Sequence, residues 1–354
     1  MKHLTFFSAS VLALVFGIGL YTLPAHAATA TSLILTDTTK WSTGITILQS
    51  LNLSTNKLTT LRKLPNNTTI RAQAFNGSRI VFSKNQDLYI GKITGGTDVR
   101  IAKFTGCKGD SSCTISAISF SHSGRYILYQ YEGYYLYDIL TGRTKKITSS
   151  FNIQGISPTD RFYFDNGYSG AQHDTVTFNL YRRTTLAKKS FALTQGYVGI
   201  TEIAPNELHL AWVTGGSTNA TTNVTTPSVI HLTRLDNGQR MTDLQLEGAT
   251  DFLTWINPTS FIAIQTFNKT TDTPSYKAYL VTITKHQMTA KLITTIVDRT
   301  ITDVQLLDTK QVVLWSNYND TASYSTLSTT GKLSKLMTVS NPKSDWFQLV
   351  GVKK

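Results

Sequence analysis

Short runs of alternating apolar and polar residues recur along the chain, separated by turn-forming pairs that contain glycine. The clearest unit covers residues 114–148 and reads TISAISFSHSGRYILYQYEGYYLYDILTGRTKKIT. Its four runs are rich in β-branched and aromatic residues, which favour strands, and its Ser-Gly, Glu-Gly and Thr-Gly pairs favour turns. The pattern predicts a four-stranded antiparallel meander, which is the structure of one propeller blade.

The same order of four runs recurs before and after this unit. One unit precedes it over residues 70–104, and four follow it, beginning at Ile153, Val198, Thr250 and Ile301. A repeat of about 40 to 50 residues is typical of β-propellers. These units therefore predict six complete blades.

The two ends of the chain supply the strands of one more blade. Three runs, SLILTDT, ITILQSLNL and KLTTLRKL, come first, and a single run, DWFQLVGV, comes last. We expect the last run to be the inner strand of a blade shared with the first three, which would close the ring and protect its sheet edges. The predicted fold is an all-β, seven-bladed propeller of four-stranded antiparallel blades, with six blades as the alternative.

The first 27 residues have the pattern of a secretory signal peptide. Lys2 precedes an apolar run over residues 4–23, and the sequence AHA predicts cleavage after Ala27. We therefore expect one propeller domain, 28–354, that is secreted or held in the extracytoplasmic envelope without a stable membrane span. Because roughly 20 apolar residues can also cross a bilayer, an uncleaved anchor is the alternative.

Composition and charge indicate a folded, basic protein. Hydrophobic residues make up 40% of the chain and charged residues 16%, while the formal net charge is +13. An excess of Lys and Arg favours association with anionic surfaces such as envelope polymers or acidic glycans. Nucleic acid is not expected as a partner, because the sequence has neither a basic helix nor an aromatic-basic RNA-binding motif.

The basic clusters fall on or beside the predicted fourth strands, which form the outer edges of the blades. They contain Arg143, Lys145 and Lys146, then Arg182, Arg183, Lys188 and Lys189, and finally Lys332 and Lys335. Lysines on an outer strand prevent association of sheet edges. A specific polyanion site is the alternative interpretation.

Two cysteines lie close together in a polar segment. Cys107 and Cys113 are separated by the sequence KGDSS. In an oxidising compartment such a pair predicts a local disulfide. A metal site is the alternative, although two thiolates without further ligands nearby do not complete a tetrahedral set.

One unit resembles the repeat of TolB-like and WD40-like propellers. Its residues 118–129, ISFSHSGRYILY, and 135–148, YLYDILTGRTKKIT, are similar to the family patterns W-S-P-D-G-K-x-I-A-F and I-Y-x-x-D-L-x-T-G, and ISPTDR at 156–161 repeats the first part. Phe120, His122 and Ser123 replace the usual Trp, Pro and Asp. The resemblance implies a non-catalytic scaffold that binds proteins or peptides, and it transfers no active site.

The third position of every predicted inner strand is polar. These residues are Arg71, Ser116, Gln154, Glu202, Asp251, Asp303 and Asp345. Because inner strands line the channel of a propeller, we expect the last four to form an acidic arc at one channel mouth. Carboxylates suit a hard cation such as calcium, or a cationic ligand group. Solvated strand ends are the alternative, and no other cofactor or metal is predicted.

No stretch carries an unambiguous catalytic signature. The sequence GYSGA at 167–171 resembles a nucleophile elbow, but it ends in Ala and lies in a predicted hairpin. We therefore expect an exported, non-enzymatic, monomeric propeller that binds a protein, a peptide or an anionic envelope polymer. The alternative is a hydrolase or lyase, metal-assisted or not, whose closely spaced channel-mouth carboxylates supply an acid and a base.

Overall fold

The computed structural model describes fourteen segments of the chain: 32–37, 45–65, 68–73, 77–106, 115–148, 152–169, 175–195, 198–216, 226–267, 275–285, 287–297, 299–318, 321–340 and 347–353. The secretory segment 1–27, its cleavage site after Ala27, Cys107, Cys113 and Asp345 all lie outside these segments. Within them, no helix is long and apolar enough to cross a membrane.

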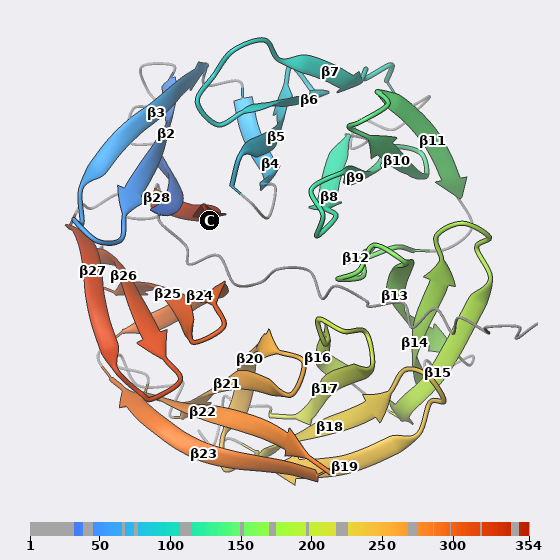
Figure 1. The fold of residues 1–354 in the computed structure, drawn as a ribbon, viewed down its shortest axis with the longest axis vertical. Coiled ribbons are helices and arrows are strands. Elements are labelled where there is room, and N and C mark those ends of the chain that lie inside the picture. The colour runs from blue at the N-terminus through green and yellow to red at the C-terminus, as the bar shows by residue number, and fades with distance from the viewer. Residues whose placement is uncertain are drawn as a thin grey trace, which may run out of the picture.

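The described strands form seven four-stranded sheets around a central axis (Figure 1). From the channel outward, blade 1 contains β28 (Phe347–Lys353), β1 (Ser32–Asp37), β2 (Ile45–Asn52) and β3 (Leu58–Pro65). Blade 2 contains β4 (Thr68–Gln73), β5 (Arg79–Lys84), β6 (Asp87–Lys92) and β7 (Val99–Ala102). Blade 3 contains β8 (Ser116–Phe120), β9 (Tyr126–Gln130), β10 (Tyr134–Asp138) and β11 (Arg143–Thr148).

The remaining four blades repeat this order. Blade 4 contains β12 (Gly155–Ile156), β13 (Phe162–Ser169), β14 (Thr175–Arg182) and β15 (Lys188–Gln195). Blade 5 contains β16 (Val198–Ile203), β17 (His209–Gly215), β18 (Ser228–Arg234) and β19 (Arg240–Gln245). Blade 6 contains β20 (Ala249–Asn257), β21 (Ser260–Phe267), β22 (Ser275–Thr284) and β23 (Gln287–Ile296), and blade 7 contains β24 (Thr300–Asp308), β25 (Gln311–Tyr318), β26 (Thr321–Ser328) and β27 (Leu333–Ser340). The predicted seven-bladed, all-β propeller is confirmed, and the six-bladed alternative is wrong.

Blade 1 combines strands from distant parts of the sequence. β28 pairs antiparallel with β1, so that Val352 lies opposite Leu33 and Leu349 lies opposite Leu35. The register shifts between Ile34 and Leu35. A strand near the end of the chain thus occupies the inner position of a sheet whose other three strands come first in the sequence.

Burial changes from the middle to the outside of each blade. The second strand of blade 6, β21, has the sequence SFIAIQTF, and its six central residues are all buried. The outer strand β23 of the same blade alternates between exposed and covered positions. Because both faces of a middle strand pack against neighbouring blades, it is almost continuously apolar, whereas an outer strand retains polar residues.

The hydrophobic core is divided into seven clusters, and each cluster lies between two neighbouring blades. For example, Phe178 of blade 4 and Trp212 of blade 5 belong to one cluster, and Ile34 of blade 1 and Ile80 of blade 2 belong to another. Apolar packing therefore joins every neighbouring pair of blades.

The turns between the first two strands of blades 3, 4 and 5 share one backbone geometry. Gly124, Asp160 and Glu207 occupy the same turn position with φ of 71°, 61° and 56°. Each donates its N–H to the carbonyl oxygen three residues earlier, over 2.9, 2.9 and 2.8 Å. Glycine adopts this left-handed conformation freely, whereas a residue with a side chain must be stabilised there by its contacts.

Two of these turn residues form hydrogen bonds to the preceding blade. The carboxylate of Asp160 accepts hydrogen bonds from the backbone N–H of His122, at 3.0 Å, and from the hydroxyl of Ser123. The carboxylate of Glu207 accepts one from the N–H of Thr159, at 2.8 Å. Since both acidic residues are buried, these charge-assisted bonds stabilise the alignment of blades 3, 4 and 5.

Candidate functional site

The described acidic residues of the predicted arc lie on the inner strands of consecutive blades, but not at one level of the sheets. The paired residues show a bulge in β16, β20 and β24. Asp251 is the bulged residue of β20, Asp303 is the first paired residue after the bulge in β24, and Glu202 is the second in β16. Alignment of the inner strands by sequence alone predicts the third strand position for all three residues.

The three carboxylates also differ in their contacts. Asp251 is half-buried and accepts a hydrogen bond from the hydroxyl of Thr266 in its own blade. Asp303 is half-buried and accepts bonds from the N–H of Val304, at 2.8 Å, and from the side-chain amide of Gln305, at 2.9 Å. Hydrogen bonds within their own blades therefore hold the carboxylates of Asp251 and Asp303.

Glu202 differs from both, because its side chain is exposed. Desolvation by the surrounding protein raises its pKa to about 7. Glu202 is the described member of the arc that is best placed to exchange a proton.

The other predicted channel residue, Arg71 of β4, is exposed, and its Nε donates a hydrogen bond to Ser83 at 3.2 Å. Across the described segments, no group of three or more His, Cys, Asp or Glu side chains has a geometry that could hold a metal ion. Binding of calcium or of a cationic ligand at the arc stays a prediction.

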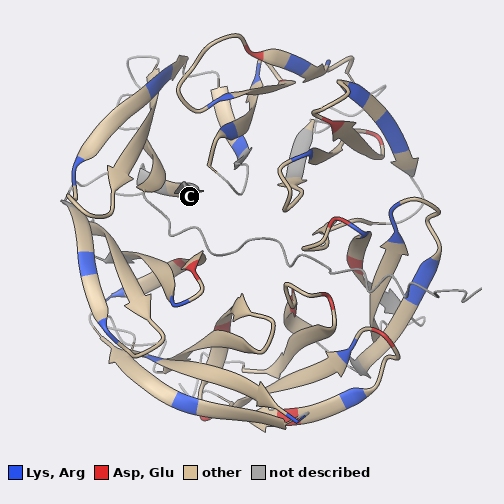
Figure 2. Ribbon diagram, viewed as in Figure 1, with Lys and Arg blue, Asp and Glu red and all other residues tan. Residues whose placement is uncertain are grey.

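The outer strands carry the opposite charge. Figure 2 shows Lys and Arg around the rim of the ring. The seven outer strands contain a single acidic residue, Asp243, and eleven basic ones: Arg62, Lys63, Arg100, Arg143, Lys145, Lys146, Lys188, Lys189, Arg240, Lys291 and Lys335. This excess gives the rim a positive potential that attracts anionic polymers.

The basic residues of β11 are the largest group on any one outer strand. Some other rim cations have acidic partners, as in the ion pairs of Arg100 with Asp87, at 3.2 Å, and of Arg240 with Asp243, at 2.6 Å. Arg143, Lys145 and Lys146 are all exposed, and none of the ion pairs between described residues includes them. β11 is also the edge of its sheet, because it pairs only with β10. These three residues, which we call the β11 triad of cations, are therefore available to an external anion.

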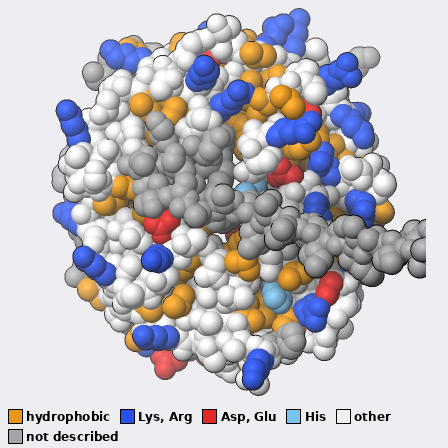
Figure 3. Space-filling view, viewed as in Figure 1, with side chains coloured by type: hydrophobic (Ala, Val, Ile, Leu, Met, Phe, Trp, Pro, Cys, Tyr) orange, Lys and Arg blue, Asp and Glu red, His pale blue; other side chains and the backbone are white. Residues whose placement is uncertain are grey.

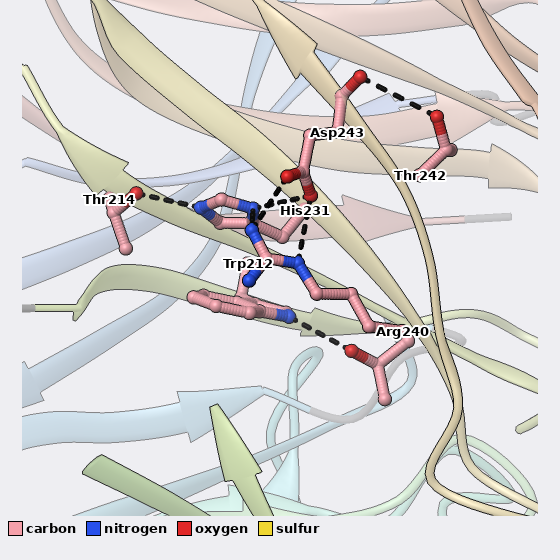
Figure 4. A network of polar contacts seen from close by, with 7 residues as sticks. Trp212, Thr214, His231, Arg240, Thr242 and Asp243 are labelled. Carbon is pink, nitrogen blue, oxygen red and sulfur yellow. Dashed lines mark hydrogen bonds and ion pairs between the residues drawn. The ribbon is translucent and has the colours of Figure 1, made fainter. Parts of the chain in front are cut away.

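A polar network around the buried ring of His231 in blade 5 was missed by the sequence reasoning. The hydroxyl of Thr214 lies 2.7 Å from Nε2 of His231, and Nδ1 of His231 lies 2.7 Å from a carboxylate oxygen of Asp243 (Figure 4). The ring of His231 also packs on Trp212, with 4.0 Å between the ring centroids. Cross-strand pairing explains the contacts, because His231 is opposite Trp212 on one side and Asp243 on the other.

The order hydroxyl, imidazole, carboxylate is that of a nucleophile activated by a general base. Here Arg240 changes the chemistry: its guanidinium lies 2.7 Å from Nδ1 of His231 and 2.6 Å from Asp243. Burial, opposed by the hydrogen bond to Asp243, lowers the pKa of His231. A neutral imidazole that packs on Trp212 and donates from Nδ1 to Asp243 is a stabilising element of the blade, and we assign it no catalytic role.

The view in Figure 3 shows basic side chains dispersed around the periphery of one face, with apolar side chains between them. The fold and this charge distribution together define the class of protein: a β-propeller scaffold with a basic rim. Solved structures with low sequence identity show the same fold.

An oligogalacturonate lyase in complex with manganese has a TM-score of 0.56 with 10% identity, covering 87% of this chain and 84% of the other. The β-propeller domain of Cps50 (Swd1) from Myceliophteria thermophila gives 0.50 with 11% identity, over 78% and 89%. TolB from Acinetobacter baumannii gives 0.47 with 13% identity, over 94% and 67%. No family model and no curated protein matches the chain. The chain is thus similar in fold to the lyase and to the Cps50 propeller domain, at identities that show the fold alone.

Proposed function

We propose that this protein is an extracytoplasmic, non-enzymatic binding scaffold that holds an anionic polymer on its outer strands. The observation that carries the proposal is the excess of eleven basic residues over one acidic residue on these strands. Scattered lysines would be enough to keep sheet edges apart, whereas β11 alone concentrates three cations. A polymer of the cell envelope is the partner that this charge would meet after export.

The binding has a defined physical character. Exposed cations attract an anionic chain over a distance of about 10 Å at moderate ionic strength, and added salt weakens this attraction. The β11 triad of cations should contribute most, since its three charges lie together on one strand and none of them is in an internal ion pair. Affinity should therefore be salt-sensitive and should depend on blade 3 more than on the other blades.

Binding to dextran sulfate, with neutral dextran as the uncharged control, tests this proposal. The purified mature chain would be compared with a triple variant of β11, Arg143→Ser, Lys145→Ser and Lys146→Ser. A matched variant, Lys63→Ser, Lys291→Ser and Lys335→Ser, removes the same charge from three other outer strands. We expect salt-sensitive binding to dextran sulfate that the β11 variant weakens more than the matched variant does. Binding that neither variant weakens would overturn the proposal.

A further inference from the structure

An aromatic ring pair lies directly beside Lys146 of the β11 triad of cations. In blade 3, Tyr135 of β10 is paired across the sheet with Tyr129 on one side and Lys146 on the other. The rings of Tyr129 and Tyr135 are stacked, with 5.3 Å between centroids and 11° between planes, and Nζ of Lys146 lies 5.8 Å from the centroid of Tyr135. Tyr129 is buried, whereas Tyr135 is half-buried. The partly exposed ring of Tyr135 is therefore held in place by stacking on Tyr129 and lies next to the ammonium group of Lys146.

A second ring pair extends this surface toward blade 2. Tyr131 follows β9, and both Tyr131 and Tyr135 pack against the apolar cluster between blades 2 and 3. Its ring is tilted by 58° against Phe104, with 6.1 Å between centroids. The Tyr131 hydroxyl donates a hydrogen bond to the carbonyl oxygen of Gly106, at 3.0 Å, and lies 2.5 Å from the hydroxyl of Thr105. Packing and hydrogen bonds thus fix the half-buried ring of Tyr131.

Cations and flat rings side by side favour one class of anionic polymer. A polyphosphate or another sugar-free polyanion gains from cations alone and has no use for an aromatic face. An acidic polysaccharide carries carboxylates that pair with Lys and Arg, and its sugar rings also present C–H faces that pack on aromatic rings. Because the tyrosine rings are already held in place, little side-chain freedom is lost on binding.

We propose that blade 3 binds an acidic polysaccharide, with the β11 triad of cations pairing with its carboxylates and the rings of Tyr131 and Tyr135 packing against its sugars. This inference rests on the proposed function and specifies its ligand class. An acidic peptide added as a strand to the edge of β11 would use the same cations, but it would not need the rings.

The test compares three probes: alginate, which combines sugars and carboxylates; polyphosphate, which is a sugar-free polyanion; and poly-glutamate, which is an acidic peptide. The variant Tyr135→Leu keeps apolar volume but removes the flat face. Its matched control is Tyr89→Leu, because Tyr89 is also half-buried and also stacks on a buried ring, that of Phe82, at 5.7 Å between centroids. Unfolding midpoints would show that each variant is folded.

We expect Tyr135→Leu to weaken alginate binding about fivefold to tenfold, the size of one aromatic contact, and to leave polyphosphate binding unchanged. Tyr89→Leu should change neither, and the β11 triple variant should weaken both. If Tyr135→Leu binds alginate as well as the unmodified protein does, or if poly-glutamate binds more tightly than alginate, the polysaccharide inference is overturned while the proposed function survives. If the triple variant loses no affinity for any probe, the proposed function fails as well.

Discussion

Replacing Asp160 by glycine tests whether turn-to-turn hydrogen bonds join the blades. The carboxylate of Asp160 accepts hydrogen bonds from the N–H of His122, at 3.0 Å, and from the hydroxyl of Ser123, both in the preceding blade. Glycine fits the backbone, because Gly124 occupies the same turn position of blade 3 with φ of 71°, close to the 61° of Asp160. The change Asp160→Gly therefore removes the carboxylate without forcing the turn to rearrange.

The magnitude follows from the two lost bonds. A hydrogen bond to a charged group contributes about 1.5–3 kcal/mol. The exposed hydroxyl of Ser123 can bond to water in the variant, so the smaller part of the loss comes from it. Glycine makes the unfolded chain more flexible, at about 1 kcal/mol, but it also relieves a left-handed conformation that costs about the same, and the two effects offset. We expect Asp160→Gly to lower the free energy of unfolding by about 2–3 kcal/mol.

Equilibrium unfolding in urea measures this change. Asp160→Asn is the matched control, since asparagine tolerates positive φ and keeps one acceptor oxygen, and it should lose about half as much. A free energy of unfolding for Asp160→Gly within about 0.5 kcal/mol of the unmodified protein would refute the reasoning, because such a value is typical of an unengaged surface residue.

Three further outcomes are expected. Burial holds the pKa of His231 below its ordinary 6.5, so the unfolded state takes up the proton first and the free energy of unfolding should fall as pH falls below about 6.5. A His231→Gln variant should lose this part of the pH dependence. An unchanged pH profile of stability in that variant would contradict the prediction. Desolvation raises the pKa of Glu202 from 4.5 to about 7, so the folded state takes up this proton first. The contribution of Glu202 to the free energy of unfolding should therefore decrease as pH rises from 4.5 to 7. A carboxyl NMR titration of Glu202 near 4.5 would disprove the shift. Gly331 has a φ of +89°, and a β-carbon there would lie 1.9 Å from the carbonyl oxygen of Ile293. Gly331→Ala should therefore lower the free energy of unfolding by about 2–4 kcal/mol. An unchanged thermal unfolding midpoint would count against the packing described.

Most of the architecture could be predicted because its signals are local. The unit 114–148 shows its four strands through runs of β-branched and aromatic residues and its turns through glycine, and the structure has β8 to β11 there. The inner strand of blade 4 was less predictable. β12 is only two residues long, and a β-carbon at Gly155 would lie 2.7 Å from the ring of Phe164, a contact that depends on how the next strand packs.

The candidate sites were only partly predictable. The sequence placed the β11 triad of cations on an outer edge, because the fourth run of a blade has one neighbour. It could not show that Asp251, Asp303 and Glu202 occupy three different positions relative to the bulges of their strands, since bulges form through pairing with the adjacent strand. It also missed the contact of His231 with Asp243, because these residues are twelve positions apart in the sequence and meet only through the register of β18 with β19.

The sequence by itself determined the repeating strands, the number of blades and the basic character of the outer strands, because side-chain alternation, turn residues and charge are local properties of each segment. Only the tertiary structure decided which side chains meet. The stacking of Tyr129 on Tyr135 beside Lys146 depends on the register between strands, and the hydrogen bond from the His122 N–H to Asp160 depends on the packing of one blade on the next. A register shift of one residue would turn a side chain to the opposite face of its sheet, so such contacts exist only once the strands and blades have assembled.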